Sequence, residues 1–456
     1  MLYAILFIEG FVSIALEILT IRQLMPFVGS SVVATSLIIG VFLLFLAFGY
    51  FRGGQCKLNF TKVLQRNFVI TAAFAGLGLS YFLINILFSF FSHLGLTNTL
   101  FSLSAYLLLI TAPMIYFIGQ TIPITMNLVK KGELVGNTGG KVLFLNTLGS
   151  FLGATITTLV LTEYFGVTWT VYITFLLTTA LFFLLPQKNK NLINKESGKA
   201  LFSIFLLIVI TYITNISLNG TYFNATTNYA NYSILQASSP LYKSDVKLLE
   251  INRSFSSLLS NKREGFPYVE LIKRILFKDL ALKNKEILVL GAGGFTMSAQ
   301  GSHSNNFTYV DIDPKIKEIA ENGFIEKVNG SFIAADARSF MRQNNKSYDV
   351  IISDTYSHKQ SIPAELLTIE YLQNIKHSLS KNGLAIFNII ENPLLGDKFA
   401  KHTDSTIRYV FKSCSATPLS FATHSTNIIY VCQKNKVEED NYIYSDDKNR
   451  VTLESS

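Results

Sequence analysis

The chain has 456 residues, which is enough for two or three domains of ordinary size. Only 15% of the residues are charged and 37 are phenylalanine, a composition that argues against an ordinary soluble protein. Residues 1–219 hold 12 basic and 5 acidic side chains, whereas residues 220–456 hold 27 and 25. The basic excess therefore lies among apolar segments, which is typical of a membrane protein and argues against a nucleic-acid-binding surface.

Seven mostly apolar stretches in the first half approach the length of about 20 residues that a membrane-spanning helix needs. They comprise residues 2–20, 31–51, 67–92, 101–128, 142–162, 167–186 and 200–217. We therefore predict an α-helical transmembrane domain of about seven helices at residues 1–219, embedded in a lipid bilayer. Pro113 and Pro123 lie inside the fourth stretch, so we expect a kink or break there.

Basic residues gather in the loops that follow the second and fourth stretches and precede the seventh. They are Arg52, Lys57, Lys62, Arg66, Lys130, Lys131, Lys141, Lys188, Lys190, Lys195 and Lys199. These loops lie on one side of the membrane, and the positive-inside rule makes that side cytoplasmic. With seven spans the second half of the chain would face outward. One miscounted or re-entrant span would return it to the cytoplasm, so its side stays open.

Two carboxylates, Glu9 and Glu17, lie inside the first stretch. Carboxylates within a membrane are costly and usually face a cavity or the interior of a helix bundle. They could form a polar site for a substrate head group or a cation. Alternatively, they could hydrogen-bond between helices, with Arg22 as a partner for Glu17.

The cysteines and histidines give little sign of chemistry. Cys56, Cys414 and Cys432 are widely spaced and form no CxxC motif, so we expect separate buried or interfacial thiols. The six histidines are scattered, and His358 has no neighbouring pair of ligands, so we predict no metal site. His358 could orient an acceptor, but a solvated loop residue is the simpler interpretation.

The second half changes in pattern to that of an α/β domain. Residues 229–260 alternate between polar and apolar and predict a small β-hairpin region, and residues 266–281 predict an amphipathic helix. Residues 287–290 then form a short apolar run typical of a buried parallel strand, and the glycine-rich turn 291–294 follows at once. Glycines there allow a tight turn and a close approach to a ligand, although an ordinary strand-to-helix turn would look the same.

Acidic residues follow the next three predicted strands, at about residues 307–310, 331–335 and 348–353. They are Asp311, Asp336 and Asp354. Ligands of open α/β sheets bind outside the carboxyl ends of the strands, so these side chains and Gly291 are candidates for one site. Asp311 is placed to accept hydrogen bonds from ribose hydroxyls. Asp336 could receive an adenine amine or could cap the helix predicted at 337–343.

The alternation continues to the end of the domain. We predict a helix at 364–378, a strand at 384–389, and further strands near 408–412 and 426–432. The fold class is therefore a multi-span helical domain followed by a Rossmann-like domain at residues 220–433. Residues 434–456 are expected to be a loose polar tail.

The second half resembles the spermidine/spermine synthase family of aminopropyltransferases, whose fold is of the class I methyltransferase type. The resemblance covers residues 225–432 and rests on LVLGAGGFTMSA, YVDIDPKIKEIA, AADARSFM and the run from Tyr348 to Tyr371. The first half is similar to the spans of bacterial membrane-fused members, in FIEGFVSIALEILTIRQL and VGNTGGKVLFLNTLGSFLGA. The resemblance implies an integral protein of the bacterial inner membrane.

The resemblance also implies a chemistry and assigns roles within it. The donor would be decarboxylated S-adenosylmethionine or S-adenosylmethionine, and an aminopropyl group would pass to an amine by direct displacement. Asp354 would be the catalytic, amine-activating acid. The donor would lie against Gly291, Gly293, Asp311, Asp336 and Ala337, and the acceptor against Tyr268, Glu270 and Tyr356.

The sequence departs from the family pattern mainly where the amines bind. Gly294 replaces the acid that holds the donor amine, and Ser357 replaces a second acid near Asp354. Ala230 follows Tyr229 where a glutamine is usual, and Val269 stands in a Tyr-His-Glu motif. We therefore expect free putrescine to be a poor acceptor. The acceptor would be larger, less charged or delivered through the membrane.

Three functions stay open on the sequence. The first is a membrane-anchored aminopropyltransferase of the spermidine synthase type. The second is another S-adenosylmethionine-dependent reaction, either methyl transfer or nucleoside cleavage. The third is a transporter or sensor in which the second half is a nucleotide-binding module.

Overall fold

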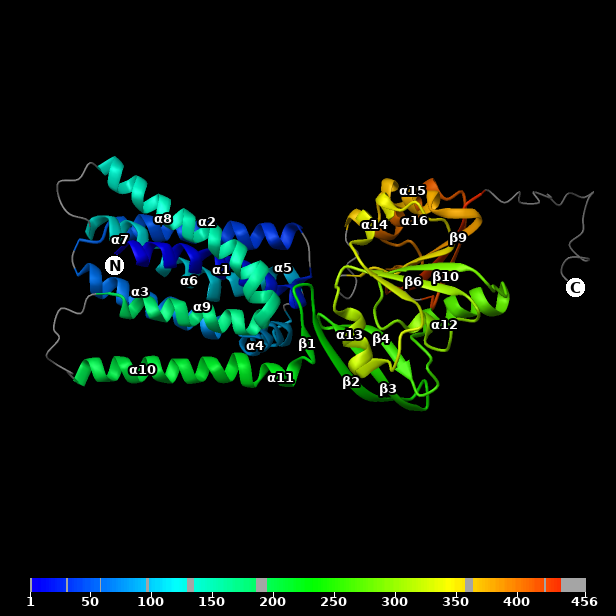
Figure 1. Cartoon of the computed structure of the whole chain (residues 1–456), viewed down its shortest axis with the longest axis horizontal. Helices are drawn as coiled ribbons and strands as arrows, with labels where there is room; N and C mark the ends of the chain where they lie inside the picture. Colours follow the sequence, from blue (N-terminus) through cyan, green and yellow to red (C-terminus); the bar gives the residue numbers. More distant parts are fainter. Residues whose placement is uncertain are drawn as a thin grey trace, which may run out of the picture.

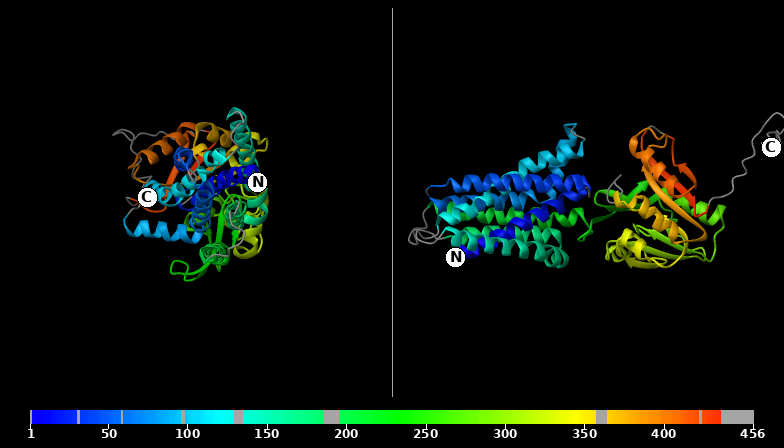
Figure 2. Two further views of the ribbon diagram at one scale, coloured as in Figure 1. Left: turned by 90° about the vertical axis from the view of Figure 1, so that its left-hand side faces the viewer. Right: turned by 90° about the horizontal axis from the view of Figure 1, so that it is seen from above.

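The computed structural model describes residues 2–29, 32–57, 59–95, 98–128, 135–185, 195–356, 364–421 and 424–435. The first half of the chain forms an elongated helical bundle, and the second half forms an α/β body beyond one end of that bundle (Figure 1). The right-hand view of Figure 2 shows the same separation along the long axis.

The bundle is built from helices that run along its length, with several short π-helical segments (η). Its elements are α1 Leu2–Val28, α2 Val32–Gly54, α3 Phe60–Ala73, η1 Phe74–Gly78, α4 Tyr81–His93, α5 Thr99–Tyr106, η2 Leu107–Thr111, α6 Ala112–Gly119, α7 Thr121–Leu128, α8 Val135–Ile156, η3 Thr157–Phe165, α9 Gly166–Phe183, α10 Lys195–Tyr212, η4 Ile213–Ser217 and α11 Asn219–Tyr222. Four stretches of the described residues are long and apolar enough to cross a membrane, and a bent pair would be a fifth.

The bent pair corrects the third predicted stretch. Residues 60–78 and 81–93 form two helices at 72° to each other, not one helix at 67–92. The reason is Ser80, whose extended backbone and side chain start α4 by accepting a hydrogen bond from Leu83 N at 3.3 Å. The expected break in the fourth stretch is confirmed, because η2 precedes Pro113 and α6 ends at Gly119.

One of the two acidic residues of α1 contacts a neighbouring helix. Glu9 is 1% exposed and accepts a hydrogen bond from Asn146 of α8, which is the inter-helix arrangement. Glycines let these helices approach, since a Cβ on Gly149 would lie 2.1 Å from the carbonyl oxygen of Phe7. The suggested pairing of Glu17 with Arg22 is wrong, because Arg22 donates its hydrogen bonds to Thr227 and Asn231 in the second half.

A small antiparallel sheet joins the bundle to the rest of the second half. It consists of β1 Ala225–Thr226, β2 Asn231–Ser239, β3 Ser244–Ile251 and β4 Ser254–Ser260, paired in chain order. It confirms the predicted hairpin region. The helical segment that follows, α12 Pro267–Lys273 with η5 Arg274–Asp279, matches the predicted amphipathic helix.

The core of the second half is a seven-stranded sheet of order β10-β11-β9-β8-β5-β6-β7. Its strands are β5 Glu286–Leu290, β6 Asn306–Asp311, β7 Ser331–Ala334, β8 Tyr348–Ser353, β9 Leu379–Glu391, β10 Ser413–Pro418 and β11 Thr426–Gln433. The strands from β5 to β9 are parallel to one another, whereas β11 is antiparallel to both β9 and β10. This is the Rossmann-like, methyltransferase-type fold, with its switch point between β5 and β8.

Alternate residues of the central strands bury both faces of this sheet. Val289 and Ile352 enter one core with Phe295 and Ile316, while Leu288 and Ile351 enter a second core on the other face. This explains why the strands read as continuous apolar runs. Its other helical elements are η6 Thr296–Ser298, α13 Ile316–Ile319, η7 Ala320–Phe324, α14 Ala337–Gln343, η8 Ala364–Leu366, α15 Ile369–His377 and α16 Lys398–Val410.

The predicted strand near 408–412 is wrong. Most of that run belongs to α16, which Asp397 begins by accepting a hydrogen bond from Ala400 N at 2.8 Å. Ala400, Thr403, Ile407 and Val410 are buried at helical spacing along it. The strand begins only at Ser413. The predicted tail from 434 lies almost wholly outside the described residues.

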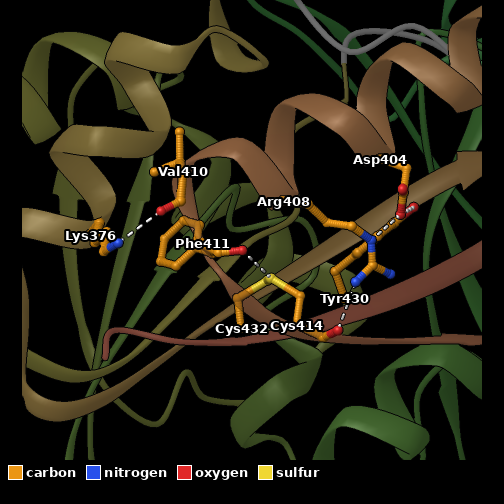
Figure 3. The surroundings of a disulfide bond; sticks show 8 residues. All are labelled: Lys376, Asp404, Arg408, Val410, Phe411, Cys414, Tyr430 and Cys432. Carbon is orange, nitrogen blue, oxygen red and sulfur yellow. Dashed lines mark hydrogen bonds and ion pairs between the residues drawn. A yellow bond between two sulfur atoms is a disulfide. The ribbon is translucent and has the colours of Figure 1, made fainter. Parts of the chain in front are cut away.

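The expectation of separate thiols is also wrong for two of the three cysteines. Cys414 of β10 and Cys432 of β11 form a disulfide beneath α16 (Figure 3). The antiparallel pairing of the two strands puts these residues directly opposite each other. The spacing of 18 residues could not show this, because it depends on the register of the strands.

Candidate functional site

The glycine-rich turn lies where the ends of three strands meet. Gly291 has a φ of +88°, and a Cβ there would lie 2.2 Å from the carbonyl oxygen of Asp354. Gly291 N donates to Val310 O and Asp354 N donates to Leu290 O, both at 2.9 Å. Only glycine allows this approach, so the turn and the end of β8 are held against each other at the switch point.

Ser257 of β4 fixes the second part of the turn. Its hydroxyl accepts a hydrogen bond from Gly294 N at 2.8 Å, and a Cβ on Gly293 would lie 2.9 Å from the same oxygen. The small sheet therefore covers the turn. Gly293 differs from Gly291, because its φ of +48° favours glycine while its close neighbours are serine side chains and not backbone.

Asp311 ends β6 and faces the turn. Its Oδ2 accepts from Ala292 N at 2.9 Å and its Oδ1 accepts from Asp313 N at 3.1 Å. Burial raises the pKa of Asp311, and the backbone donors partly offset that rise. An ionised carboxylate has about four acceptor positions, so both oxygens can still receive hydroxyl groups.

Asp336 lies two residues after the end of β7 and caps α14. Its Oδ1 accepts a hydrogen bond from Ser339 N at 2.8 Å, and Ala337 is the first residue of the helix. Asp336 therefore caps the helix, which was one of the two roles predicted for it. It uses Oδ1, which leaves Oδ2 for an exocyclic amine, so the two roles of Asp336 are compatible.

Asp354 follows β8, and each of its two carboxylate oxygens accepts a hydrogen bond. Tyr268 OH donates to its Oδ2 at 2.8 Å, and Asn388 Nδ2 donates to its Oδ1 at 2.9 Å. Asn427 in turn donates to Asn388 Oδ1 at 2.9 Å. Burial raises the pKa of Asp354, whereas the two hydrogen bonds lower it. The result is an oriented carboxyl group with acceptor positions remaining on both oxygens.

The two other predicted acceptor-binding residues are engaged with the protein itself. Tyr356 OH donates to Asn388 O at 3.0 Å and accepts from Ile390 N at 2.7 Å, so it is fastened to β9. Glu270 accepts from Gly265 N at 2.7 Å and from Lys273 Nζ at 2.8 Å. A role for Glu270 in binding an amine remains a prediction, and the amine would share the carboxylate with Lys273.

Asn388 was missed by sequence reasoning. It is a polar side chain within an apolar strand, in the run Ala385-Ile386-Phe387-Asn388-Ile389, and it is 3% exposed. An isolated buried amide needs hydrogen-bond partners, and this was the signal that could have identified it. Ser357 and His358 lie outside the described residues.

The departure at Gly294 has a physical counterpart. A Cβ on Gly294 would lie 2.2 Å from the ring of Phe324. The next residue, Phe295, has a φ of +58° and is fully buried in the core. A side chain at 294 would therefore meet Phe324, and an acid could not be restored there without moving that ring.

Residues 265–441 match the family model of the spermine/spermidine synthase domain. A polyamine aminopropyltransferase of Vibrio vulnificus is 31% identical over 160 residues, which are 33% of this chain and 51% of that protein. One of Sulfolobus acidocaldarius is 31% identical over 182 residues, or 37% and 58%. The chain thus spans about half the length of these relatives.

Among solved structures, a probable spermidine synthase from Corynebacterium glutamicum has a TM-score of 0.40 and 22% identity. The match covers 47% of this chain and 80% of that chain.

Proposed function

We propose that this protein, whose residues 265–441 are a spermine/spermidine synthase domain, transfers an aminopropyl group from decarboxylated S-adenosylmethionine to an amine. The observation that carries the proposal is the Asp354 carboxyl group, which Tyr268 and Asn388 orient at the switch point of the sheet. Asp311 lies at the end of β6, on the other side of β5 from β8, and supplies acceptors for a ribose. Ligands of such sheets bind at this edge.

The reaction needs little from the protein beyond orientation and one proton acceptor. The amine nitrogen attacks the aminopropyl carbon bonded to the positively charged sulfur, a C–N bond forms, and the C–S bond breaks. The sulfur keeps the electron pair and leaves as a neutral thioether. Asp354 takes or steers the proton that an ammonium acceptor must lose, and its negative charge also attracts that cation.

The direct test measures release of the thioether nucleoside, 5′-methylthioadenosine, by the purified full-length protein. Decarboxylated donor is offered with putrescine, with longer polyamines and with amines of lower charge. Amine-dependent release that is lost in Asp354→Asn supports the proposal. Absence of release with every amine, while the protein binds the donor, would exclude aminopropyl transfer to these acceptors.

One observation favours a second candidate, transfer from intact S-adenosylmethionine. Phe324 occupies the space into which an acid at position 294 would project, so the contact that usually holds the donor amine is missing. Calorimetry with intact and decarboxylated donor distinguishes the two. Tighter binding of the intact form would favour methyl transfer over aminopropyl transfer.

We also propose that the helical bundle crosses a lipid bilayer seven times. Four stretches are long and apolar enough to cross a membrane, and one of them, Gly136–Leu184, has 49 residues and is counted as two spans. It contains Gly166, whose φ of +79° lets the chain reverse between η3 and α9. The bent pair and the shorter apolar helix Phe202–Ser217 complete the count. Large apolar side chains such as Phe48, Phe144 and Phe202 are 50–65% exposed, which favours lipid contact.

We propose further that the second half lies outside the cytoplasm. The chain then enters the bundle at the end remote from the α/β body, and the basic residues Arg52, Lys57 and Arg66 flank that remote end. The positive-inside rule makes the remote end cytoplasmic. The Cys414–Cys432 disulfide supports the same side independently, because disulfides persist in oxidising compartments.

A further inference from the structure

One arginine of the helical bundle reaches into the second half of the chain. Arg22 lies in the last two turns of α1 and is 7% exposed. Its Nη2 donates to Thr227 O at 2.6 Å and to Asn231 Oδ1 at 3.1 Å. These residues flank the turn between β1 and β2, so α1 is bonded directly to the start of the small sheet.

The contact continues from that turn to the donor side of the site. Thr227 Oγ1 donates to Asp313 Oδ2 at 2.5 Å, and Tyr232 OH donates to the same oxygen at 2.6 Å. Asp313 N then donates to Asp311 Oδ1 at 3.1 Å. Hydrogen bonds thus link Arg22 to Asp311 through two intervening residues.

Charge reinforces the link. Asp313 is 1% exposed, and Arg22 lies close enough to interact electrostatically with its carboxylate. A buried carboxylate needs both hydrogen bonds and a compensating charge. Loss of the Arg22 cation would therefore act on Asp313 as well as on the backbone of Thr227.

A second contact supports the same segment from outside. Lys315, two residues after Asp313, forms an ion pair with Glu163 of η3 at 3.0 Å. Asn228 donates to the other oxygen of Glu163 at 2.5 Å. Both sides of this pair are about 40% exposed, so the pair contributes less than the buried link.

We infer that Arg22 is a positioning residue through which the helical bundle holds Asp311 in its donor-binding position. The inference rests on the proposed function, since it takes Asp311 to be the ribose-binding acid. Its consequence is that donor affinity depends on a side chain of the bundle that does not touch the donor.

The test compares two arginines at the junction in the full-length protein. Arg22→Gln removes the link, whereas Arg253→Gln removes another junction contact, since Arg253 donates to Asn85 and lies 4.7 Å from the ring centre of Phe27. Binding of decarboxylated donor and of 5′-methylthioadenosine is measured by calorimetry, and turnover is measured at saturating donor.

We expect Arg22→Gln to weaken donor binding about tenfold with kcat largely kept, and Arg253→Gln to change it less than twofold. Arg22→Lys should recover part of the affinity. Thr227→Val, which removes the hydroxyl but leaves the bundle intact, should reproduce the loss and serves if Arg22→Gln does not fold. Equal effects of the two glutamine variants, or normal binding in both Arg22→Gln and Thr227→Val, would overturn the inference. If the wild-type protein binds neither nucleoside, the proposed function fails as well.

Discussion

Asp354 receives two hydrogen bonds and is the proton acceptor of the proposed reaction. Asp354→Asn keeps the shape of the side chain but removes its charge and its ability to accept a proton. We expect turnover to fall about 100-fold or more, with donor affinity largely kept, in a steady-state assay of 5′-methylthioadenosine release.

A matched control lies on the same strand. Asp349 of β8 interacts with Lys285 and Ser380, away from the turn. Asp349→Asn should leave turnover close to that of the wild type. Near-normal turnover in Asp354→Asn would leave that carboxylate with a structural role only.

Asp311 should act on binding and not on the chemical step. Its two oxygens are fixed by Ala292 N and Asp313 N, which aim the carboxylate at the position expected for the ribose. A hydrogen bond to a charged group contributes about 1.5–3 kcal/mol, so Asp311→Ala should weaken donor binding by a factor of ten or more. Calorimetry on a folded variant measures this. Unchanged affinity would remove Asp311 from the site.

Glu391, at the end of β9, gives the domain a pH dependence of its own. It is 1% exposed, and burial raises its pKa from 4.5 to about 7 despite the hydrogen bond from Tyr430 OH. The folded state therefore holds the proton more tightly than the unfolded state. The contribution of Glu391 to the free energy of unfolding is therefore greatest below pH 4.5. It is lost as the pH rises towards 7, and the loss is at most about 3 kcal/mol.

Glu391→Gln cannot ionise, so its melting temperature should fall less than that of the wild type between pH 5 and pH 8. The measurement is thermal unfolding of both proteins across that range. Parallel curves for the two proteins would show that Glu391 does not titrate there.

At the scale of elements, the sequence predicted those features that depend on local pattern. Parallel strands buried on both faces read as apolar runs, and their carboxyl ends meet at one edge, so Gly291, Asp311 and Asp354 could be grouped before their contacts were known. The helix at 337–343 followed from Asp336 as its cap.

Features that depend on register or on distant packing could not be predicted in this way. The disulfide requires the pairing of β10 with β11, and the grip of Asn388 on Asp354 requires β9 to lie beside β8. Residues 408–412, most of which belong to α16, were predicted as a strand because they contain a short apolar run. Arg22 was assigned to Glu17, its neighbour in sequence, since no local pattern points to Thr227.

At the scale of the whole molecule, the contacts between the two halves show which ends of the helices lie next to the α/β body. The end of α1 meets the α/β body at Thr227, α4 meets it through Asn85, which accepts a hydrogen bond from Arg253, and η3 meets it through Glu163. The end of α2, the start of α3, the end of α7 and the start of α8 lie at the remote end (Figure 1). The proposed orientation follows from the charges of that end.

Single cysteines at the two ends test the orientation. Lys262 is exposed in the α/β body, and Lys57 lies in the connection between α2 and α3. Each is changed to cysteine in a protein whose Cys56 is serine, and a membrane-impermeant maleimide is added to intact cells stripped of any outer envelope. We expect Lys262→Cys to be labelled at once and Lys57→Cys only after permeabilisation. The reason is that the hydrocarbon core of the bilayer, about 30 Å thick, separates the two sites. The native pair should at the same time resist alkylation until a reductant is added. The reverse labelling pattern would place the α/β body in the cytoplasm and would leave the basic end of the bundle outside, against the positive-inside rule.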